Sequence, residues 1–426
     1  MSDAPVKMSK VIVDGTPYEM PAGANLLGEL LKLGRHDNKY PDQRDHGDHY
    51  VPHYCWHPGL SVSGNCRMCF VNITTEMKQG DQVKKVTTPS IACNTTVRDG
   101  MEIDTRSEGV KKIQNGVQEF LLINHPLDCP ECDKSGECRL QDYAFDFGRD
   151  HSRFDVVKAG SHIKQLGPSI DFFGTRCIQC SRCIRFTDEV SGTSELCFVN
   201  RGDRTTIDTF PGEPIDNGLD LNVVQVCPVG ALKNHDFLYQ ARVWSLQEGE
   251  SVCNLCAKGC AVRYDSMRGV VKRVYAAENR DVNGWWACNE GRLDFGWINS
   301  ADRLLQPRNK QGELSWDEAY SAVVARLKTH MDKDPGSLAV VLNCSQTVEE
   351  LYLMRKLFKD VLHAAAFAAI ARPNQAWPEK YKNFNQSDDR NPNRRGVELV
   401  FGIADAEGSV RDLASKLKRS EERRVG

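Results

Sequence analysis

The sequence has no hydrophobic run long enough to cross a membrane, and neither sign of charge dominates it. Its most apolar stretch, residues 363–371 (HAAAFAAIA), is far shorter than the roughly 20 residues that a spanning helix needs. The opening residues contain no apolar segment followed by a small-residue cleavage site, so we expect a protein of the reducing cytoplasm. With 55 basic against 58 acidic residues, nucleic acid is not an expected partner.

Several chemical fingerprints are also missing. The chain has no G-x-G-x-x-G dinucleotide loop, no G-x4-G-K-[ST] phosphate loop, no nucleophile elbow and no H-E-x-x-H zinc-protease motif. We therefore expect this chain to bind no flavin, NAD or molybdopterin, and to contribute no catalytic residue and no complete active site.

What the sequence has in abundance is cysteine. Of its 17 cysteines, all but Cys344 lie at or before Cys288. Structural disulfides do not explain so many cysteines in a reducing compartment, so metal ligands are the first alternative to consider. A length of 426 residues indicates about three or four folding units.

Hydrophobic periodicity gives a coarse outline of the elements. It predicts a hairpin and then a helix within residues 9–35, a helix over 108–125 and strand-like structure over 262–276. Residues 36–57, which include five histidines, have the composition of a loop. After residue 302 the pattern is α/β, with a helix over 315–331, a strand over 337–343 and a helix over 347–371. We expect residues 373–426, rich in Asn, Arg and Asp, to pack poorly.

The first cysteine group is Cys55, Cys66, Cys69 and Cys93, with the spacing C-x10-C-x2-C-x23-C. Plant-type ferredoxins hold a [2Fe–2S] cluster with C-x4-C-x2-C and a distant fourth cysteine, so only the first gap differs. The preceding hairpin and helix favour such a domain. A zinc site remains the alternative, although zinc knuckles usually have two C-x2-C pairs and this group has one.

The second group is His125, Cys129, Cys132 and Cys138, in which three thiols and one imidazole lie within a short segment. A fourth cysteine is absent locally, so either His125 or a distant residue completes the site. A lone histidine is more often a surface residue, but this one precedes Pro126 at an expected helix end. As a neutral ligand it would raise the potential of a cluster relative to an all-cysteine site, as histidine does in Rieske centres.

The third group, Cys177, Cys180, Cys183 and Cys227, has the C-x2-C-x2-C pattern with a distant Cys-Pro that bacterial ferredoxins use for [4Fe–4S] clusters. The fourth group is Cys253, Cys256, Cys260 and Cys288, whose spacing suits either a [4Fe–4S] cluster or zinc; its context favours iron. For Cys197 and Cys344 we expect buried positions as small hydrophobic residues.

Four motifs in this order resemble the large iron–sulfur subunit (the G subunit) of bacterial NADH:quinone oxidoreductase, respiratory complex I. They are CWHPGLSVSGNCRMC, HPLDCPECDKSGEC, CIQCSRCIRF and CPVGAL, and the likeness extends over about residues 9–300. The resemblance implies one [2Fe–2S] cluster on the first group and three [4Fe–4S] clusters on the others. It matches the fourth group to a cluster that some bacterial members keep off the main electron route.

The resemblance also implies an α+β multidomain fold. The expected parts are a β-grasp [2Fe–2S] ferredoxin-like domain (1–107), a small helical [4Fe–4S] module with one histidine and three cysteine ligands (108–150), a [4Fe–4S] ferredoxin-like domain (151–247), a [4Fe–4S] module (248–304) and a truncated α/β molybdopterin-oxidoreductase-like remnant (305–426). Residues 302–319 resemble the entry to that last domain. Residues 419–426 (RSEERRVG) equal a translated sequencing adapter, and we hypothesise that they are an artefact.

The resemblance further implies electron relay from a flavin-bearing NADH-oxidising subunit towards quinone, in contact with other iron–sulfur subunits of the peripheral arm. The protein would then lie on the cytoplasmic side of the inner membrane and contact it only through the complex. Two alternatives stay open: the electron-transfer subunit of an NAD-linked formate dehydrogenase or hydrogenase, and a scaffold that binds several zinc ions.

Overall fold

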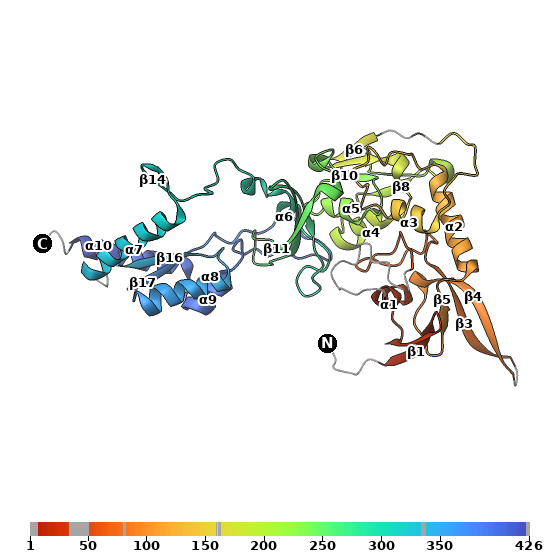
Figure 1. Ribbon diagram of the computed structural model, residues 1–426, viewed down its shortest axis with the longest axis horizontal. Coiled ribbons are helices and arrows are strands. Elements are labelled where there is room, and N and C mark those ends of the chain that lie inside the picture. Colours follow the sequence, from red (N-terminus) through yellow and green to blue (C-terminus); the bar gives the residue numbers. More distant parts are fainter. Residues whose placement is uncertain are drawn as a thin grey trace.

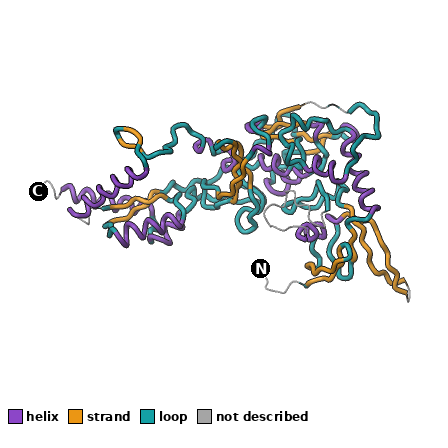
Figure 2. Tube along the Cα trace, viewed as in Figure 1, coloured by secondary structure: helices purple, strands orange, loops and turns teal. Residues whose placement is uncertain are grey.

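The computed structural model describes residues 7–33, 51–79, 82–158, 160, 163–333 and 338–422. The molecule is elongated, with the cysteine-rich front at one end and a smaller back lobe at the other (Figure 1). Figure 2 shows that long loops connect many of the helices and strands, particularly around the middle of the molecule.

The front begins with a five-stranded mixed sheet in the order β2-β1-β5-β3-β4. Strands β1 and β2 form the expected hairpin, β5 pairs parallel with β1, and β3 pairs antiparallel with both β5 and β4. Helix α1 packs its buried leucines against this sheet. The bounds are β1 Met8–Val13, β2 Thr16–Pro21, α1 Leu26–Leu33, β3 Phe70–Gln79, β4 Gln82–Ile91 and β5 Glu102–Asp104.

Two helices, α2 (Glu108–Ile123) and α3 (Arg139–Phe147), form the next module. Gln118 is fully buried between them: its side-chain amide donates to the Leu140 carbonyl at 3.2 Å, and its oxygen accepts from the Tyr54 hydroxyl at 2.5 Å. One amide therefore joins both helices to the loop that carries the first cysteine group, and the helix expected over residues 108–125 is confirmed.

The third part surrounds a three-stranded antiparallel sheet in the order β10-β7-β6, with a second two-stranded sheet, β8-β9, beside it. Helix α4 continues directly into a π-helical turn at Thr187–Ser191. The bounds are β6 Ile163–Gly167, β7 Ile170–Phe173, α4 Arg182–Phe186, β8 Cys197–Val199, β9 Thr206–Asp208, α5 Leu221–Val226 and β10 Leu232–Asn234.

A three-stranded antiparallel sheet follows, formed by β11 (Gln247–Val252), β12 (Ala261–Met267) and β13 (Val270–Ala276), and then the short helix α6 (Asn289–Leu293). The strand-like structure expected over residues 262–276 is thus confirmed as a hairpin, β12-β13. Short 3-10 turns complete the front at Ala92–Asn94, Gly174–Arg176, Gly202–Arg204, His235–Phe237, Val243–Ser245 and Gly296–Ile298.

The back lobe is α/β, with two parallel strands, β16 and β17, at its centre. Its small core contains aliphatic residues and the buried Cys344. The bounds are β14 Arg308–Asn309, β15 Gly312–Glu313, α7 Trp316–Lys333, β16 Ala339–Asn343, α8 Val348–Met354, a π-helical turn Arg355–Val361, β17 Ala366–Ile370, α9 Arg394–Phe401 and α10 Ala406–Glu422.

The helix expected over residues 347–371 is wrong at its end. The chain is helical only to Val361, and Ala366–Ile370 is the strand β17. A short apolar run does not distinguish a buried strand from a buried helix. Here the parallel ladder with β16 decides for the strand, since it hydrogen-bonds the backbone of a segment whose Ala368 and Ala369 are fully buried.

The expectation of poor packing over residues 373–426 is also wrong. Val397 of α9 and Ala406 of α10 are buried in the back core, and residues 377–391, which we call the return segment, pack on the front. This stretch leaves the back lobe and runs along the front, where Phe384 joins the large front core. The backbone amide of Asn383 donates to the Val190 carbonyl at 3.0 Å, and the amide of Ala257 donates to the Asp389 carbonyl at 2.8 Å. These backbone bonds satisfy polar groups on both partners, which composition alone does not reveal.

Candidate metal centres

The four thiols of the first group are gathered between loop 51–69 and the turn Ala92–Asn94. The amide of Cys55 points at the Cys66 sulfur, at 3.5 Å. Hydrogen bonds from the thiols of Cys66 and Cys93 lower the pKa of Cys55, and a hydrogen bond from Cys93 lowers that of Cys69. The four sulfur atoms therefore lie within reach of one another, as the ligands of one centre must.

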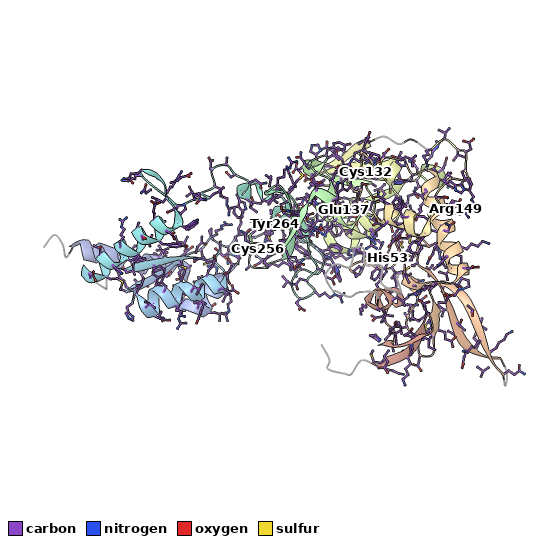
Figure 3. The ribbon with its side chains drawn as sticks, viewed as in Figure 1. His53, Cys132, Glu137, Arg149, Cys256 and Tyr264 are labelled. Carbon is purple, nitrogen blue, oxygen red and sulfur yellow. The ribbon has the colours of Figure 1, made fainter. Side chains whose placement is uncertain are left out.

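The residues of the second group lie around a small recess between the end of α2 and the start of α3. His125, Cys129, Cys132 and Cys138 all line it, and Gly230 closes one side. A Cβ atom on Gly230 would lie 2.2 Å from the Cys132 sulfur, so only glycine fits there. Figure 3 labels Cys132 in the front of the molecule.

The imidazole of His125 is held in its neutral form. Burial lowers its pKa to about 4, and the positive charges of Lys158 and Arg176 act in the same direction. Burial also raises the pKa of the Cys138 thiol to about 12. A neutral imidazole nitrogen is the form that binds metals, so the environment of His125 fits the role of a ligand.

In the third group the chain winds tightly around its own cysteines. Gln179 directly precedes Cys180 and Ser181 directly follows it. Both have left-handed backbone conformations, with φ of 53° and 61°. In this arrangement the amide of Gln179 approaches the Cys177 sulfur at 3.4 Å. Non-glycine residues rarely adopt such conformations, and they concentrate at functional sites where the surroundings compensate the strain.

Cys227, at the end of α5, lies close enough to the three thiols of the C-x2-C-x2-C segment to contribute to the rise of their pKa values. Burial raises the pKa of Cys177 to about 12 and that of Cys180 to about 11. Protonated thiols predominate in such a site unless a metal cation stabilises the thiolates, so these residues suit a buried cationic centre.

The fourth group is assembled at the N-terminal end of α6. The amide of Cys253 donates to the Cys260 carbonyl at 2.8 Å, which closes the loop that carries three of the thiols. Cys288 caps α6, and a Cβ on Gly291 would be 3.2 Å from the Cys253 sulfur and 3.8 Å from that of Cys288. Cys256 lies towards the side that leads to the back lobe (Figure 3).

The return segment, residues 377–391, covers this fourth group. The side chain of Gln386 hydrogen-bonds to the Cys288 thiol, and this bond partly offsets the burial that raises the pKa of Cys288 to about 12. Sequence reasoning missed Gln386, because nothing in its local sequence indicates contact with a cysteine almost a hundred residues earlier.

Buried cations lie beside the thiols. Lys134 is buried next to Glu137, with 3.4 Å between nitrogen and oxygen; burial lowers its pKa, but the negative charge of Glu137 outweighs this and keeps the ammonium charged. The same ammonium acts on Cys227, and the guanidinium of Arg182 acts on Cys180. Positive charge near a set of thiolates offsets their mutual repulsion.

Charged and polar side chains also join the modules that carry the groups. Arg185, two residues after Cys183, donates to the carbonyls of Cys55 and Ser61 in the loop of the first group. Arg273 on β13 makes two hydrogen bonds with Glu137 in the second module, at 2.9 and 2.8 Å. These cross-links join the segment of the third group to the loop of the first, and the sheet beside the fourth group to the second module.

Not every expected position is confirmed. Cys344 is buried as expected, but Cys197 is exposed on β8. Its neighbour Leu196 takes the inward position at this two-stranded sheet, so the side chain of Cys197 faces solvent. His36, His46 and His49 lie outside the described residues. Within the described ranges, no three His, Cys, Asp or Glu side chains converge on the position of a single metal ion.

No helix in the described part of the chain combines the length and the apolar character that spanning a membrane requires.

Three family models match the chain. A 2Fe-2S iron-sulfur cluster binding domain matches residues 7–108, the NADH-ubiquinone oxidoreductase-G iron-sulfur binding region matches residues 114–153, and the ferredoxin-like domain of NADH-quinone oxidoreductase subunit 3 matches residues 167–233. The chain therefore contains domains of both the 2Fe-2S and the 4Fe-4S type, and the first three cysteine groups fall within the matched regions.

Curated relatives have the same character. The G subunit of NADH-quinone oxidoreductase from Rickettsia typhi is 33% identical over 83% of this chain and 49% of its own length. The corresponding subunit of Streptomyces coelicolor is 34% identical over 87% of this chain and 42% of its own. The 75 kDa subunit of NADH-ubiquinone oxidoreductase from Reclinomonas americana is 33% identical over 86% of this chain and 50% of its own.

Among solved structures, a chain of an NAD+-reducing [NiFe]-hydrogenase in the H2-reduced state is similar to this chain at 24% identity, with a TM-score of 0.44. The likeness covers 55% of this chain and 91% of the hydrogenase chain. The chain spans about half the length of the curated relatives it matches. Over most of its own length it is similar to the G subunits of NADH-quinone oxidoreductase, at 33–34% identity.

Proposed function

We propose that this chain relays single electrons through four iron–sulfur centres within NADH-quinone oxidoreductase, from the flavin of an NADH-oxidising subunit towards quinone. The observation that carries the proposal is the gathering of sixteen residues into four separate groups, three of them inside matched iron–sulfur domains. The homologues named for this complex support the same conclusion.

The ligand assignment is part of the proposal. Cys55, Cys66, Cys69 and Cys93 would hold a [2Fe–2S] cluster. Three [4Fe–4S] clusters would be held by His125, Cys129, Cys132 and Cys138, by Cys177, Cys180, Cys183 and Cys227, and by Cys253, Cys256, Cys260 and Cys288. The donor chemistry fits, because iron–sulfur clusters take thiolate ligands and accept histidine in place of cysteine.

When bound, such clusters accept and release one electron each without any bond to a substrate. The chain's own part is to position them, to exclude water and to set their electrostatic surroundings. Burial of most of the proposed ligands removes the thiolates from solvent, while Lys134 and Arg182 place positive charge beside the third group. Positive charge near a cluster stabilises its reduced, more negative state.

Domain limits, partners and location belong to the same proposal. We place the boundaries near residues 107, 150, 247 and 304, with a molybdopterin-oxidoreductase-like remnant after them. The proposed partners are the flavin-bearing subunit and the other iron–sulfur subunits of the peripheral arm, which would hold the chain on the cytoplasmic side of the inner membrane.

Metal analysis of the anaerobically purified chain tests the proposal. One two-iron and three four-iron clusters predict about fourteen iron atoms per chain and paramagnetic signals after reduction with dithionite. About four zinc atoms and no paramagnetic signal would instead favour the zinc scaffold. Genes for a complete molybdenum or nickel subunit beside this one would favour a formate dehydrogenase or a hydrogenase.

A second test addresses His125. The variant His125→Cys should keep its cluster but lower its reduction potential, because a thiolate adds negative charge where imidazole adds none. A potentiometric titration followed by paramagnetic resonance measures the shift. An unchanged potential would show that His125 is not a ligand.

A further inference from the structure

The loop of the first group and the segment of the third group meet at a polar interface. Residues 61–65, which precede Cys66, lie against residues 179–189, which contain Cys180 and Cys183. Three hydrogen bonds without a charged donor cross this interface: Ser61 N to the Glu189 carboxylate at 2.8 Å, Asn65 Nδ2 to the Gln179 carbonyl at 3.1 Å, and the hydroxyls of Ser63 and Ser181 at 3.1 Å. The two groups are therefore joined by residues that lie close to their own ligands in the sequence.

Arg185 on α4 supplies positive charge at this interface. Its two terminal nitrogens donate to the carbonyls of Cys55 and Ser61, and its Nε donates to the Ser181 hydroxyl at 3.2 Å. Cys55 is a proposed ligand of the first group, and Arg185 follows Cys183 of the third group by two residues. One guanidinium group thus binds the backbone of a ligand in the first group, while its own backbone adjoins a ligand of the third.

The charge of Arg185 acts on its surroundings. Among the residues that the structure describes, the hydrogen-bond partners of this guanidinium group are all neutral oxygens. Its side chain is half-buried, and partly buried charges are screened by solvent much less than exposed ones. Burial raises the pKa of the Cys180 thiol to about 11, while the positive charges of Arg182 and Arg185 act in the opposite direction. A cation that favours a thiolate also favours negative charge on a cluster that the thiolate holds.

A second arginine of α4 makes a comparable link. Arg182 donates to the carbonyls of Trp56 and Val226, each of which stands next to a proposed ligand. Its side chain is only 2% exposed, so a neutral replacement would leave buried carbonyls without donors. Arg185 is half-buried, and water can reach its carbonyl partners after a substitution.

We propose that Arg185 is a positioning residue shared by the centres of the first and third groups: it fixes the first group's loop against α4 and raises the reduction potentials of both centres. This inference rests on the proposed function, because it requires clusters at these groups. A reduced cluster carries one more negative charge than an oxidised one, so a nearby cation stabilises the reduced state. Since the same cation adjoins both groups, its loss lowers both potentials together.

The redox step requires no further reactant. Each centre takes up one electron from its donor and passes one electron to its acceptor, and no bond forms or breaks. The guanidinium group stays protonated in proteins, so its charge is constant during the transfer. Arg185 itself is neither oxidised nor reduced.

The experiment uses the full chain, prepared with its clusters under anaerobic conditions. Dithionite titration at controlled potentials, followed by paramagnetic resonance, gives the potential of each centre. The magnetic interaction between two reduced centres falls steeply with their separation, so it reports their relative position.

Arg185→Gln and Arg185→Lys are compared with the wild type and with two control variants. Asn65→Ala removes a neutral hydrogen bond from the same interface. Arg308→Gln removes the same charge from an exposed position on β14 in the back lobe.

Arg185→Gln should lower the potentials of both centres by roughly 59 mV, which is a tenfold change in a one-electron equilibrium constant. Arg185→Lys keeps the positive charge and should restore most of that shift. Asn65→Ala and Arg308→Gln should leave both potentials unchanged, because neither removes charge from the interface.

The lysine variant also separates position from charge. A single ammonium group cannot donate to both carbonyls in the planar geometry of the guanidinium group, so Arg185→Lys should weaken the magnetic interaction between the two reduced centres. This variant decides the inference if Arg185→Gln fails to hold a cluster. Retained potentials with a weakened interaction would support the inference, and an unchanged interaction would overturn it.

Wild-type potentials in Arg185→Gln, or equal shifts in either control variant, would overturn the role of Arg185 and leave the proposed function intact. A shift confined to one of the two centres would do the same. Absence of iron–sulfur signals from the wild-type chain would instead overturn the proposed function, and this inference with it.

Discussion

The front and the back lobe differ in what fills their interiors. The largest front core contains buried cysteines from all four groups together with aromatic and aliphatic side chains, and buried ion pairs join its modules. The back core is small, with aliphatic residues and Cys344 buried and phenylalanines packed against them, and α7 leaves Trp316, Tyr320 and Val323 exposed. The comparison shows that the front core buries cysteines from all four groups together with ion pairs, whereas the residues of the back core are hydrophobic.

Removing iron should have the largest effect on this comparison. If the clusters complete the front core, chelation costs the front several kcal/mol, since metal binding and folding are coupled where the ligands fill the interior. We expect amide hydrogen exchange to accelerate in the cysteine-bearing loops and to remain slow in β16 and β17. Equal loss of protection at both ends of the molecule would contradict the distinction.

Gly230→Ala should break one front centre and spare the rest. The added Cβ would lie 2.2 Å from the Cys132 sulfur, so the ligand must move out of place. We expect the loss of about four iron atoms and of one paramagnetic signal. The control is Gly116→Ala in helix α2, where no atom lies within 4 Å; it should gain about 0.5–1 kcal/mol of stability from alanine's higher helix propensity. Full iron content in Gly230→Ala would contradict the proposed site.

The buried ions of the front should matter far more than the surface pairs of the back lobe. Asp265 is completely buried between Arg263, at 2.9 Å, and Arg273, at 2.6 Å. Asp265→Asn removes the negative charge and should cost about 3 kcal/mol, because two buried guanidinium groups lose compensation.

The matched control for that change is Glu398→Gln in the back lobe. Glu398 pairs with Arg395 at 2.6 Å, but both side chains are exposed. Exposed pairs are worth about 0.5 kcal/mol or less. Urea unfolding curves of both variants give the two changes in the free energy of unfolding. Similar losses would show that burial does not make the ion pairs of the front stronger than the exposed pair of the back lobe.

The smallest expected effect depends on pH and concerns Asp220, at the start of α5. Burial raises the pKa of this carboxyl to about 7, although the side-chain amide of Asn289 donates to it at 2.6 Å. The folded state therefore keeps a proton that the unfolded chain releases near pH 4. Its contribution to stability is full below that pH and declines as the pH rises through about 7.

Asp220→Asn should remove this dependence. Relative to the wild type, the variant should gain on the order of 2 kcal/mol more near pH 8 than near pH 5. Thermal or urea unfolding at the two pH values measures the difference. The same difference between variant and wild type at both pH values would mean that Asp220 is ionised throughout.

The sequence predicted the elements of the front better than the contacts that join its modules. Alternation of apolar and polar residues predicted the first hairpin. Cysteine spacing predicts four sets of ligands, because short loops constrain the ligands of one site, and this assignment stays a prediction. The sequence could not predict Arg185, whose partners lie in the loop of the first group, or the fit of Gly230 beneath Cys132. Those contacts depend on how separate modules dock, which local patterns do not encode.

The back lobe shows the complementary limit. The run Ala366–Ile370 is compatible with helix or strand, and the neighbouring strand β16 decides between them. Exposure of Cys197 likewise follows from which of two adjacent residues faces inward at a sheet edge. Residues 377–391 have a polar composition typical of loops, yet they pack because their backbone groups find partners on the front.

The return segment has a consequence for how the protein is made. Translation delivers Cys288 to the tunnel exit well before Phe384, Gln386 and Asp389. Until those residues emerge, the growing polypeptide presents the fourth set of thiols without its cover. The late-arriving stretch then closes over them, so the order of synthesis leaves an interval in which maturation factors can reach these sulfur atoms before the nascent molecule seals itself.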